Sequence, residues 1–149
     1  MGTYIHTFAE RRKIDGSWEE IEGVDFFSQQ NYSMFGFLAD VRNYSMTPTI
    51  ALPRGLPDDV SCSIACEHES YGLYAHTASW LSLKELLEFN YDATFENRRV
   101  IVNASGAHTC KPGMGEITTY RESFCEQFQT DLLLLRAIGA ERIVFWFSD

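Results

Sequence analysis

The stretch Arg-Ile-Val-Phe-Trp-Phe at residues 142–147 decides the fold of this 149-residue chain. All of its residues after the arginine are β-branched or aromatic, and these residue types are the most enriched in strands. Both faces of such a strand are apolar, so other parts of the chain have to cover both of them. The sequence therefore predicts that residues 142–147 form a strand in a central or well-covered position of a sheet.

A hairpin near the N-terminus supplies two further strands. Residues 3–11 alternate in character with the two-residue period of a strand. Asp15 and Gly16 follow, and both tolerate the positive φ that a tight hairpin turn needs. Residues 17–21 are then the returning strand, and residues 99–104 have the pattern of another strand.

Helical periodicity occurs in four segments. The predicted helices cover residues 32–41, 59–68, 83–90 and 119–138. Asp58 is the expected N-cap of the second helix, and Ser82 and Glu85 have the spacing of a capping box before the third. Gly139 is a natural stop for the last helix.

The order of these elements favours an α+β fold. Helices and strands do not alternate as regularly as a doubly wound sheet would require. Two segments, 42–57 and 70–79, have no regular pattern and are expected to be loops. We expect a single domain over residues 1–149, with an antiparallel or mixed sheet made of the N-terminal hairpin and the C-terminal strands, and with helices packed on it.

Composition limits the classes of partner. Hydrophobic residues make up 45% of the chain and charged residues 22%, as in ordinary globular proteins. The formal net charge is -9 and the pI is about 4.8, so a nucleic-acid polymer or an anionic membrane surface would be repelled. The sequence shows no membrane span and no signal peptide, which predicts a cytoplasmic location. A homo-oligomer is compatible with this composition.

The four cysteines are expected to be reduced thiols in that location. Cys62 and Cys66 are four residues apart on a predicted helix, so they would share one face and be buried. A zinc site would also need His68, His108 or Cys110, but the spacing fits no common zinc motif. We therefore predict neither a metal nor another cofactor.

The loop at residues 42–57 combines arginines with a rigid backbone. Arg42 and Arg54 could each bind two oxygens of a phosphate or carboxylate, and Asn43 lies beside the first of them. Three prolines lower the entropy cost of holding such a loop in its binding form. The alternative is structural: the two arginines tie down the loop by bonding to carbonyls or to Asp40, Asp58 and Asp59.

A second cluster, at residues 74–80, precedes the predicted helix at 83–90. Free backbone N–H groups at a helix start favour an anion, and Ser79 belongs to this segment. His76 could donate a proton near neutral pH, and Trp80 could stack on a ring. The alternative makes Ser79 or Ser82 a helix cap, Trp80 a core residue and His76 a surface group.

Two isolated residues complete the candidate set. His6 lies in the middle of a predicted strand, which would hold a ligand-contacting group rigidly. Asn31 precedes the first predicted helix and could converge with Asn43 and the arginines in the fold. No P-loop, dinucleotide fingerprint or Gly-x-Ser-x-Gly elbow is present. The sequence therefore offers no familiar motif that would assign a reaction to these residues.

Several islands of sequence are similar to one family of small proteins. They are Met1-Gly2 with Ile5-His6, Asn31 to Asn43, the Pro-Arg-Gly-Leu-Pro loop from Pro53 to Asp59, His76 to Leu86, and Arg142 to Phe147. The chain thereby resembles bacteriophage and bacterial proteins that typically open with Met-Gly-Cys-Asp-Ile-His and have no assigned activity. The resemblance implies a phage setting, and thus a host bacterial cytoplasm. Thr3 and Tyr4 stand where the family has Cys and Asp, which disfavours a metal site at this strand.

These observations lead to three hypotheses. The first is a binding protein for a small anionic ligand of nucleotide type, which sequesters a host immune signal as an anti-defence protein. Arg42 and Arg54 would bind phosphate, Asn31 and Asn43 would position sugar or base edges, and Trp80 would stack. The second is a metal-independent hydrolase of a phosphoester or glycosidic bond that uses His6 or His76. The third is a protein that inhibits a host factor by direct contact.

Overall fold

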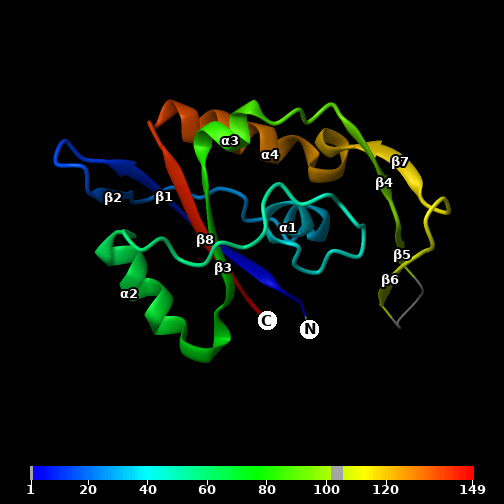
Figure 1. Ribbon diagram of the computed structural model, residues 1–149, viewed down its shortest axis with the longest axis horizontal. Coiled ribbons are helices and arrows are strands. Elements are labelled where there is room, and N and C mark those ends of the chain that lie inside the picture. The colour runs from blue at the N-terminus through cyan, green and yellow to red at the C-terminus, as the bar shows by residue number, and fades with distance from the viewer. Residues whose placement is uncertain (1, 102–105) are drawn as a thin grey trace. The chain divides into compact units, whose positions relative to one another are not determined.

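The computed structural model describes residues 2–101 and 106–149 (Figure 1). The chain divides into two compact units whose segments alternate along the sequence. The first unit comprises Met1–Gln30, Pro53–Phe89 and Gln127–Asp149, and the second comprises Asn31–Leu52 and Asn90–Glu126. The predicted single domain stays a prediction, and each unit is described by itself.

A four-stranded antiparallel sheet forms the first unit. Its strands are β1 (Tyr4–Arg12), β2 (Trp18–Ile21), β3 (His76–Ser82) and β8 (Arg142–Ser148), in the order β2-β1-β8-β3. Figure 1 shows β8, drawn red, between β1 and β3. The α+β class, the antiparallel sheet and the central position of the C-terminal strand are confirmed.

The two faces of this sheet carry different side chains. On one face Val144 and Trp146 are buried, and Ile64 from α2 (Cys62–Tyr71) packs against them. On the other face Ile143, Phe145 and Phe147 are fully buried. Because successive residues of a strand point to opposite faces, the apolar run 142–147 needs both layers.

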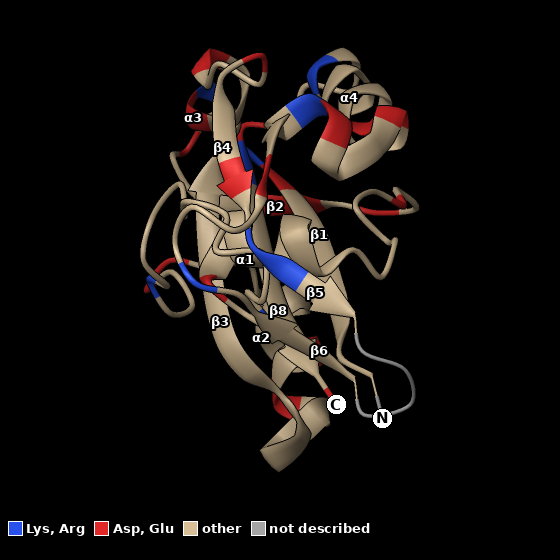
Figure 2. Cartoon of the chain, turned by 90° about the vertical axis from the view of Figure 1, so that its right-hand side faces the viewer, with Lys and Arg blue, Asp and Glu red and all other residues tan. Residues whose placement is uncertain are grey.

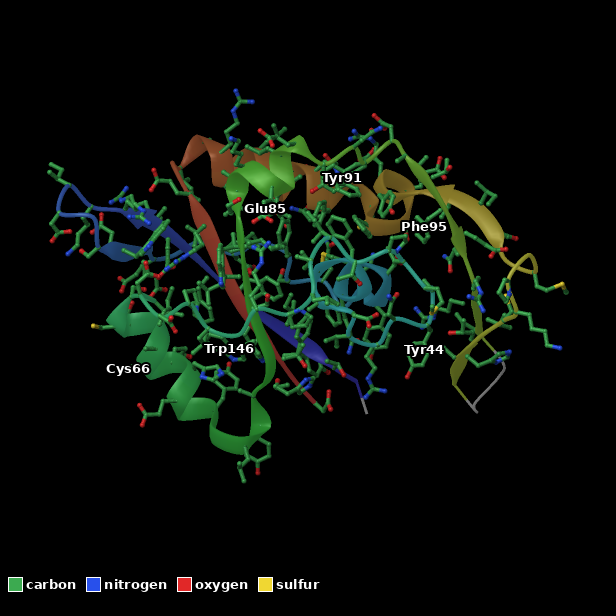
Figure 3. The ribbon with its side chains drawn as sticks, in the orientation of Figure 1. Tyr44, Cys66, Glu85, Tyr91, Phe95 and Trp146 are labelled. Carbon is green, nitrogen blue, oxygen red and sulfur yellow. The ribbon has the colours of Figure 1, made fainter. Side chains whose placement is uncertain are left out.

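The start of α2 corrects two predictions. Ser61, not Asp58, is its N-cap, so the helix begins later than expected. Cys62 and Cys66 are exposed rather than buried, and Figure 3 shows Cys66 pointing away from the sheet. Each lies two residues from buried Ile64, and a helix turns about 200° over two residues. The cysteines do share a face, but it is the solvent face.

The predicted loop at residues 70–79 is wrong in its second half. A short 3₁₀ turn, η1 (Gly72–Tyr74), follows α2, and β3 begins at His76. The register of β3 against β8 shifts between His76 and Ser79, where Thr77 has a φ of 55°. This irregularity interrupted the alternation of side chains that would have revealed the strand.

Two further helices match expectation in part. The capping box of Ser82 and Glu85 is present at the start of α3 (Leu83–Glu88), as predicted. The last helix, α4 (Tyr120–Ala137), ends before Gly139, whose φ is 78°. Unexpectedly, Cys125 interrupts α4 with φ 63° and ψ 169°. That region is populated almost only by glycine, and such strain costs about 1–3 kcal/mol.

The second unit consists of α1 (Tyr32–Ala39), the start of α4 and two ribbons. One ribbon pairs β4 (Thr94–Asn97) with β7 (Glu116–Thr119), and the other pairs β5 (Arg99–Ile101) with β6 (Ala107–Thr109). The sequence predicted only β5 among these strands; the rest of its predicted range, 102–104, lies outside the described residues. Phe37 forms the aromatic centre, with Tyr91, Tyr120 and Phe124 around it.

The longest described helix does not resemble a membrane span. None of the helices in residues 2–101 and 106–149 combines the length and the apolar character needed to cross a bilayer.

Candidate functional site

The predicted site residues fall into both units. Asn31, Arg42 and Asn43 belong to the second unit, whereas His6, Arg54, His76, Ser79 and Trp80 belong to the first. Each group is therefore considered on its own.

The two asparagines use their side chains within the second unit. Asn31 is the N-cap of α1: its Oδ1 accepts a hydrogen bond from Met34 N at 3.0 Å, and its Nδ2 donates to Ser123 O at 3.0 Å. Asn43 Nδ2 donates to Asp40 Oδ1 and to Thr47 O, each at 2.9 Å. Asn31 thus caps α1 and ties it to the backbone of α4, and Asn43 holds its own turn in place.

Arg42 occupies a turn beside Asn43. Its φ is 48°, in the left-handed region, and its Nη1 donates to Tyr44 Oη at 3.2 Å. The structural alternative expected carbonyls or aspartates as partners of Arg42, and the Tyr44 hydroxyl is neither. The role of Arg42 in binding stays a prediction.

Arg54, Ser79 and Trp80 do come together. The backbone N–H of Arg54 donates to Ser79 Oγ at 2.9 Å, and Ser79 is buried. The guanidinium carbon of Arg54 lies 4.6 Å from the centre of the Trp80 ring. The loop that carries Arg54 is therefore fixed to β3, and its cation is placed on an indole face.

The charged partner of Arg54 is Glu85, rather than Asp58 or Asp59. Nη1 donates to Oε1 at 2.9 Å and Nη2 donates to Oε2 at 2.6 Å, the bidentate geometry of a strong arginine–carboxylate pair. Hydrogen bonding from Arg54, together with that from Ser82, lowers the pKa of Glu85 to about 2. Figure 3 shows Glu85 at the junction of β3 and α3.

Sequence reasoning missed a third arginine, Arg142, at the start of β8. Its side chain is only 5% exposed and that of Glu10 is 0% exposed, and Arg142 Nε donates to Glu10 Oε1 at 2.7 Å. Its Nη1 donates to Asp59 Oδ1 at 2.8 Å, which lowers the pKa of Asp59. Trp18 Nε1 donates to the other oxygen of Asp59 at 3.0 Å. A charged residue at the edge of an apolar strand, with an acid on the neighbouring strand, was the signal available.

Three arginines and two tryptophans form a stack that we call the Arg–Trp ladder, in the order Arg12, Trp18, Arg142, Trp80, Arg54. Guanidinium carbons lie 4.7 Å and 3.9 Å from the centre of Trp18, for Arg12 and Arg142 respectively. They lie 5.8 Å and 4.6 Å from the centre of Trp80, for Arg142 and Arg54. All four contacts are within the range of cation–π attraction.

The ladder lines a cavity of about 570 Å³ in the first unit. The other lining residues are Leu56, Pro57, Asp58, Asp59, Ser82 and Glu141. A volume of this size is within the range of about 300–1,000 Å³ for small-molecule sites. Within the described part of the chain, the Asp58 carboxylate has neither an ion-pair nor a hydrogen-bond partner.

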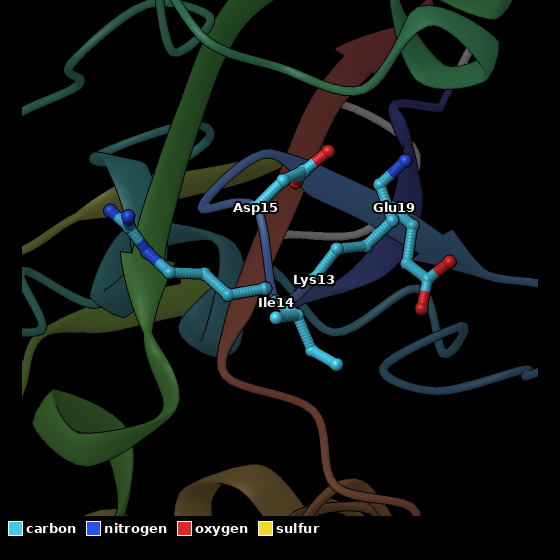
Figure 4. A pocket seen from close by; sticks show the side chains of 5 residues that line it. Lys13, Ile14, Asp15 and Glu19 are labelled. Atoms are coloured by element: carbon cyan, nitrogen blue, oxygen red, sulfur yellow. The ribbon is translucent and has the colours of Figure 1, made fainter.

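A cavity of similar volume, about 590 Å³, lies at the tip of the N-terminal hairpin (Figure 4). Its lining residues, Arg12, Lys13, Ile14, Asp15 and Glu19, all belong to β1, β2 and the turn between them. Ile14 is fully exposed there. A single hairpin cannot surround a ligand, so this hollow is the weaker candidate.

The two candidate histidines do not line the ladder cavity. His76 is paired with Phe147 in the sheet, and its Nε2 lies 3.3 Å from Asp149 Oδ1. It belongs to a strand, which corrects its predicted place in a loop before a helix start. His6 is paired with Trp146, the residue before Phe147 in β8, so it lies on the sheet face opposite to His76. This is the face that carries Arg142, but His6 lies at its other end.

The helix start at residue 83 is also not a free anion site. Ser82 Oγ accepts from Glu85 N at 3.1 Å, and Glu85 Oε1 accepts from Ser82 N at 3.0 Å. These reciprocal bonds use the N–H groups that a phosphate would need.

Charges of both signs are mixed in the protein. Figure 2 shows blue and red segments together on α4, and the ladder cavity likewise combines three arginines with Asp58, Asp59 and Glu141. The cavity is thus no simple basic pocket within an acidic chain.

Comparisons of the chain with protein-family models, with curated proteins and with solved structures find no match. The similarity to phage and bacterial proteins stays a prediction, so function has to be argued from the site itself.

Proposed function

We propose that the protein binds a small, nucleotide-type ligand with a planar ring and an anionic group in the cavity beside the Arg–Trp ladder. The observation that carries the proposal is the alternation of three guanidinium groups and two indoles along one cavity of about 570 Å³. Indoles stack on planar rings, and arginine binds phosphate or carboxylate oxygens.

The ladder arginines differ in what they can offer an anion. Arg142 is buried and bonded to Glu10 and Asp59, so its role is to position the two indoles. Arg12 is exposed, and its side-chain hydrogen bond to Gly16 O is long at 3.3 Å. Arg54 could bind an anion that displaces Glu85 from its guanidinium group. Arg12 and Arg54 are therefore the proposed anion contacts.

A carboxylate in the cavity would recognise the ring of the ligand. Asp58 is exposed and lines the same cavity as both indoles. It can accept hydrogen bonds from ring N–H or amino groups, as a nucleobase presents them. The acidic residues at this site would also repel a polyanion, which favours a mononucleotide over a nucleic-acid strand.

Binding without conversion is the form of the proposal that the geometry supports best. The catalytic alternative requires His6 or His76 beside Arg54, but neither histidine lines the cavity. A phage setting, which rests on the sequence resemblance, would make sequestration of a host signalling nucleotide the purpose of binding.

Calorimetry with a panel of mononucleotides and cyclic nucleotides tests the proposal. We expect saturable binding by the wild-type protein, quenching of tryptophan fluorescence, and affinity at least about tenfold lower for Arg12→Ala and Arg54→Ala, since charged hydrogen bonds contribute about 1.5–3 kcal/mol. Arg11→Ala is the matched control, because Arg11 is on the same strand, pairs with exposed Glu19 and does not line the cavity.

Absence of binding to every member of the panel would overturn the proposal. Recovery of intact ligand after denaturation would separate binding from hydrolysis, in which the ligand would return as product.

A further inference from the structure

A second polar cluster lies on the face of the sheet that α2 covers, outside the ladder cavity. Ser148 Oγ is 2.7 Å from His6 Nε2, and Tyr71 Oη is 3.0 Å from His6 Nδ1. In the sheet Tyr4 is paired with Ser148 and His6 with Trp146, so Ser148 and His6 are diagonal neighbours on one face. Tyr71 reaches them from the C-terminal end of α2.

The hydrogen bonds fit one arrangement of protons. If Nδ1 carries the proton and donates it to Tyr71 Oη, Nε2 is free to accept the hydroxyl proton of Ser148. A hydroxyl, an imidazole base and a third group that orients the base are the components of an activated nucleophile. The strands and α2 hold all three, so the geometry does not depend on a loop.

The surroundings suit a neutral imidazole that becomes charged during a reaction. Burial lowers the pKa of His6, which keeps the ring neutral near pH 7, while the charge of Glu67 acts in the opposite direction. Glu67 would therefore stabilise the imidazolium that forms when His6 takes a proton. Trp146 forms the floor, with its ring 6.4 Å from His6 and 5.6 Å from Tyr71.

We propose that Ser148 and His6 are a nucleophile–base pair that accepts an acyl group from a small uncharged ester, with Tyr71 as the positioning residue. Ser148 Oγ forms a bond to the carbonyl carbon while its proton moves to His6 Nε2. The ester C–O bond then breaks, and the leaving oxygen takes the proton from His6. Water, activated by the same base, hydrolyses the acyl-serine and restores both residues.

The preference for an uncharged, apolar acyl group follows from the neighbours of the pair. Glu67 and Asp149 would repel an anionic acyl group. Leu73 and Tyr74 follow Tyr71 directly and are 103% and 76% exposed, which provides apolar surface at this end of α2. Apolar side chains that lie this exposed can cover an acyl chain.

The first experiment uses the wild-type protein and p-nitrophenyl acetate. We expect release of p-nitrophenol and a mass increase of one acetyl group, which peptide mapping places on Ser148. Acetyl groups found only on lysines, with no more p-nitrophenol released than those lysines account for, would overturn the proposal. Because this result requires no variant, it does not depend on how well a variant folds.

Variants then separate the roles. Ser148→Ala is expected to abolish site-specific acetylation, and His6→Gln to slow it about 100-fold, the lower end of general-base contributions. Tyr71→Phe keeps the ring against Trp146 and removes the hydroxyl, so we expect a smaller loss and a changed pH midpoint. Ser63→Ala is the control, because Ser63 is an exposed serine bonded to Glu20. An unchanged rate in His6→Gln would show that no base acts on Ser148.

The pH profile provides a readout that a structural role would not affect. Only neutral His6 can accept the proton, so the acetylation rate should rise with pH through a midpoint below 6.5, the ordinary pKa of histidine. Arg11→Ala should acetylate normally, because Arg11 pairs with Glu19 and belongs neither to this cluster nor to the lining of the ladder cavity. Failure of nucleotide binding and failure of acylation are thus separate outcomes.

Discussion

Two polar clusters occupy opposite ends of the same sheet face, and they differ in how fully their groups are satisfied. At one end Arg142 and Glu10 are almost completely buried and bonded to each other, with Asp59 as a further partner. At the other end His6, Tyr71 and Ser148 are half-buried and uncharged at neutral pH. Apolar Val144 and Trp146 lie between them on β8. Polar groups on one sheet face are thus locked in a buried ion pair at one end and remain partly accessible to solvent at the other.

The largest expected effect comes from breaking the buried pair. Arg142→Leu leaves Glu10 as a buried carboxylate without its cation, which costs about 3–5 kcal/mol of the free energy of unfolding. It also removes the central guanidinium of the Arg–Trp ladder. Urea denaturation measures the loss.

The control for this prediction replaces both partners. Glu10→Gln combined with Arg142→Leu removes the uncompensated charge, so a good part of the stability should return. A single variant as stable as the wild type would contradict the claim that Glu10 depends on Arg142 as its buried partner.

A moderate loss of stability is expected for Glu85→Gln. This change weakens the ion pair between Arg54 and Glu85, which is less buried than the pair between Arg142 and Glu10. Side chains of Arg54 and Glu85 are 29% and 34% exposed, so solvent screens the ion pair. Loss of the pair and part of the capping box should cost about 1 kcal/mol. Thermal unfolding measures this loss. A loss as large as that of Arg142→Leu would contradict the expectation that the more buried ion pair contributes more to stability.

The pH dependence of this pair has a defined sign. The folded pKa of Glu85, about 2, is below its ordinary value of 4.5. The stabilisation is therefore fully present above pH 4.5 and is lost as the pH falls toward 2. Glu85→Gln should lack this component of acid sensitivity, whereas Glu19→Gln, at the exposed Arg11 pair, should retain it.

The smallest effect concerns the titration of His6. Because burial lowers its folded pKa, the unfolded chain binds the proton more readily, and stability decreases as the pH falls below 6.5. We expect His6→Gln to flatten the stability profile between that pH and the folded pKa of His6. NMR titration of the histidine ring measures the midpoint directly, and a midpoint above 6.5 would contradict the assigned cause.

The candidate site was only partly predictable from sequence. Arg54, Ser79 and Trp80 were predicted and do meet, because the rigid loop at Pro53 is bonded to β3. Arg142 was missed, since its contact with Trp18 joins strands far apart in the chain. Arg12 and Trp18 are paired in the predicted hairpin, but they were not considered as site residues. Asn31 and Asn43 were candidates on residue type alone, and their side chains bond to backbone groups and to Asp40 within the second unit.

The sequence by itself determined the elements whose signals are local. The apolar run at residues 142–147 required a covered central strand, and Ser82 with Glu85 specified a helix start, because periodicity and capping act within a few residues. Only the tertiary structure decided which polar residues meet. Strand register placed Arg142 against Glu10 and His6 diagonally to Ser148, and register depends on pairing between residues more than 100 positions apart.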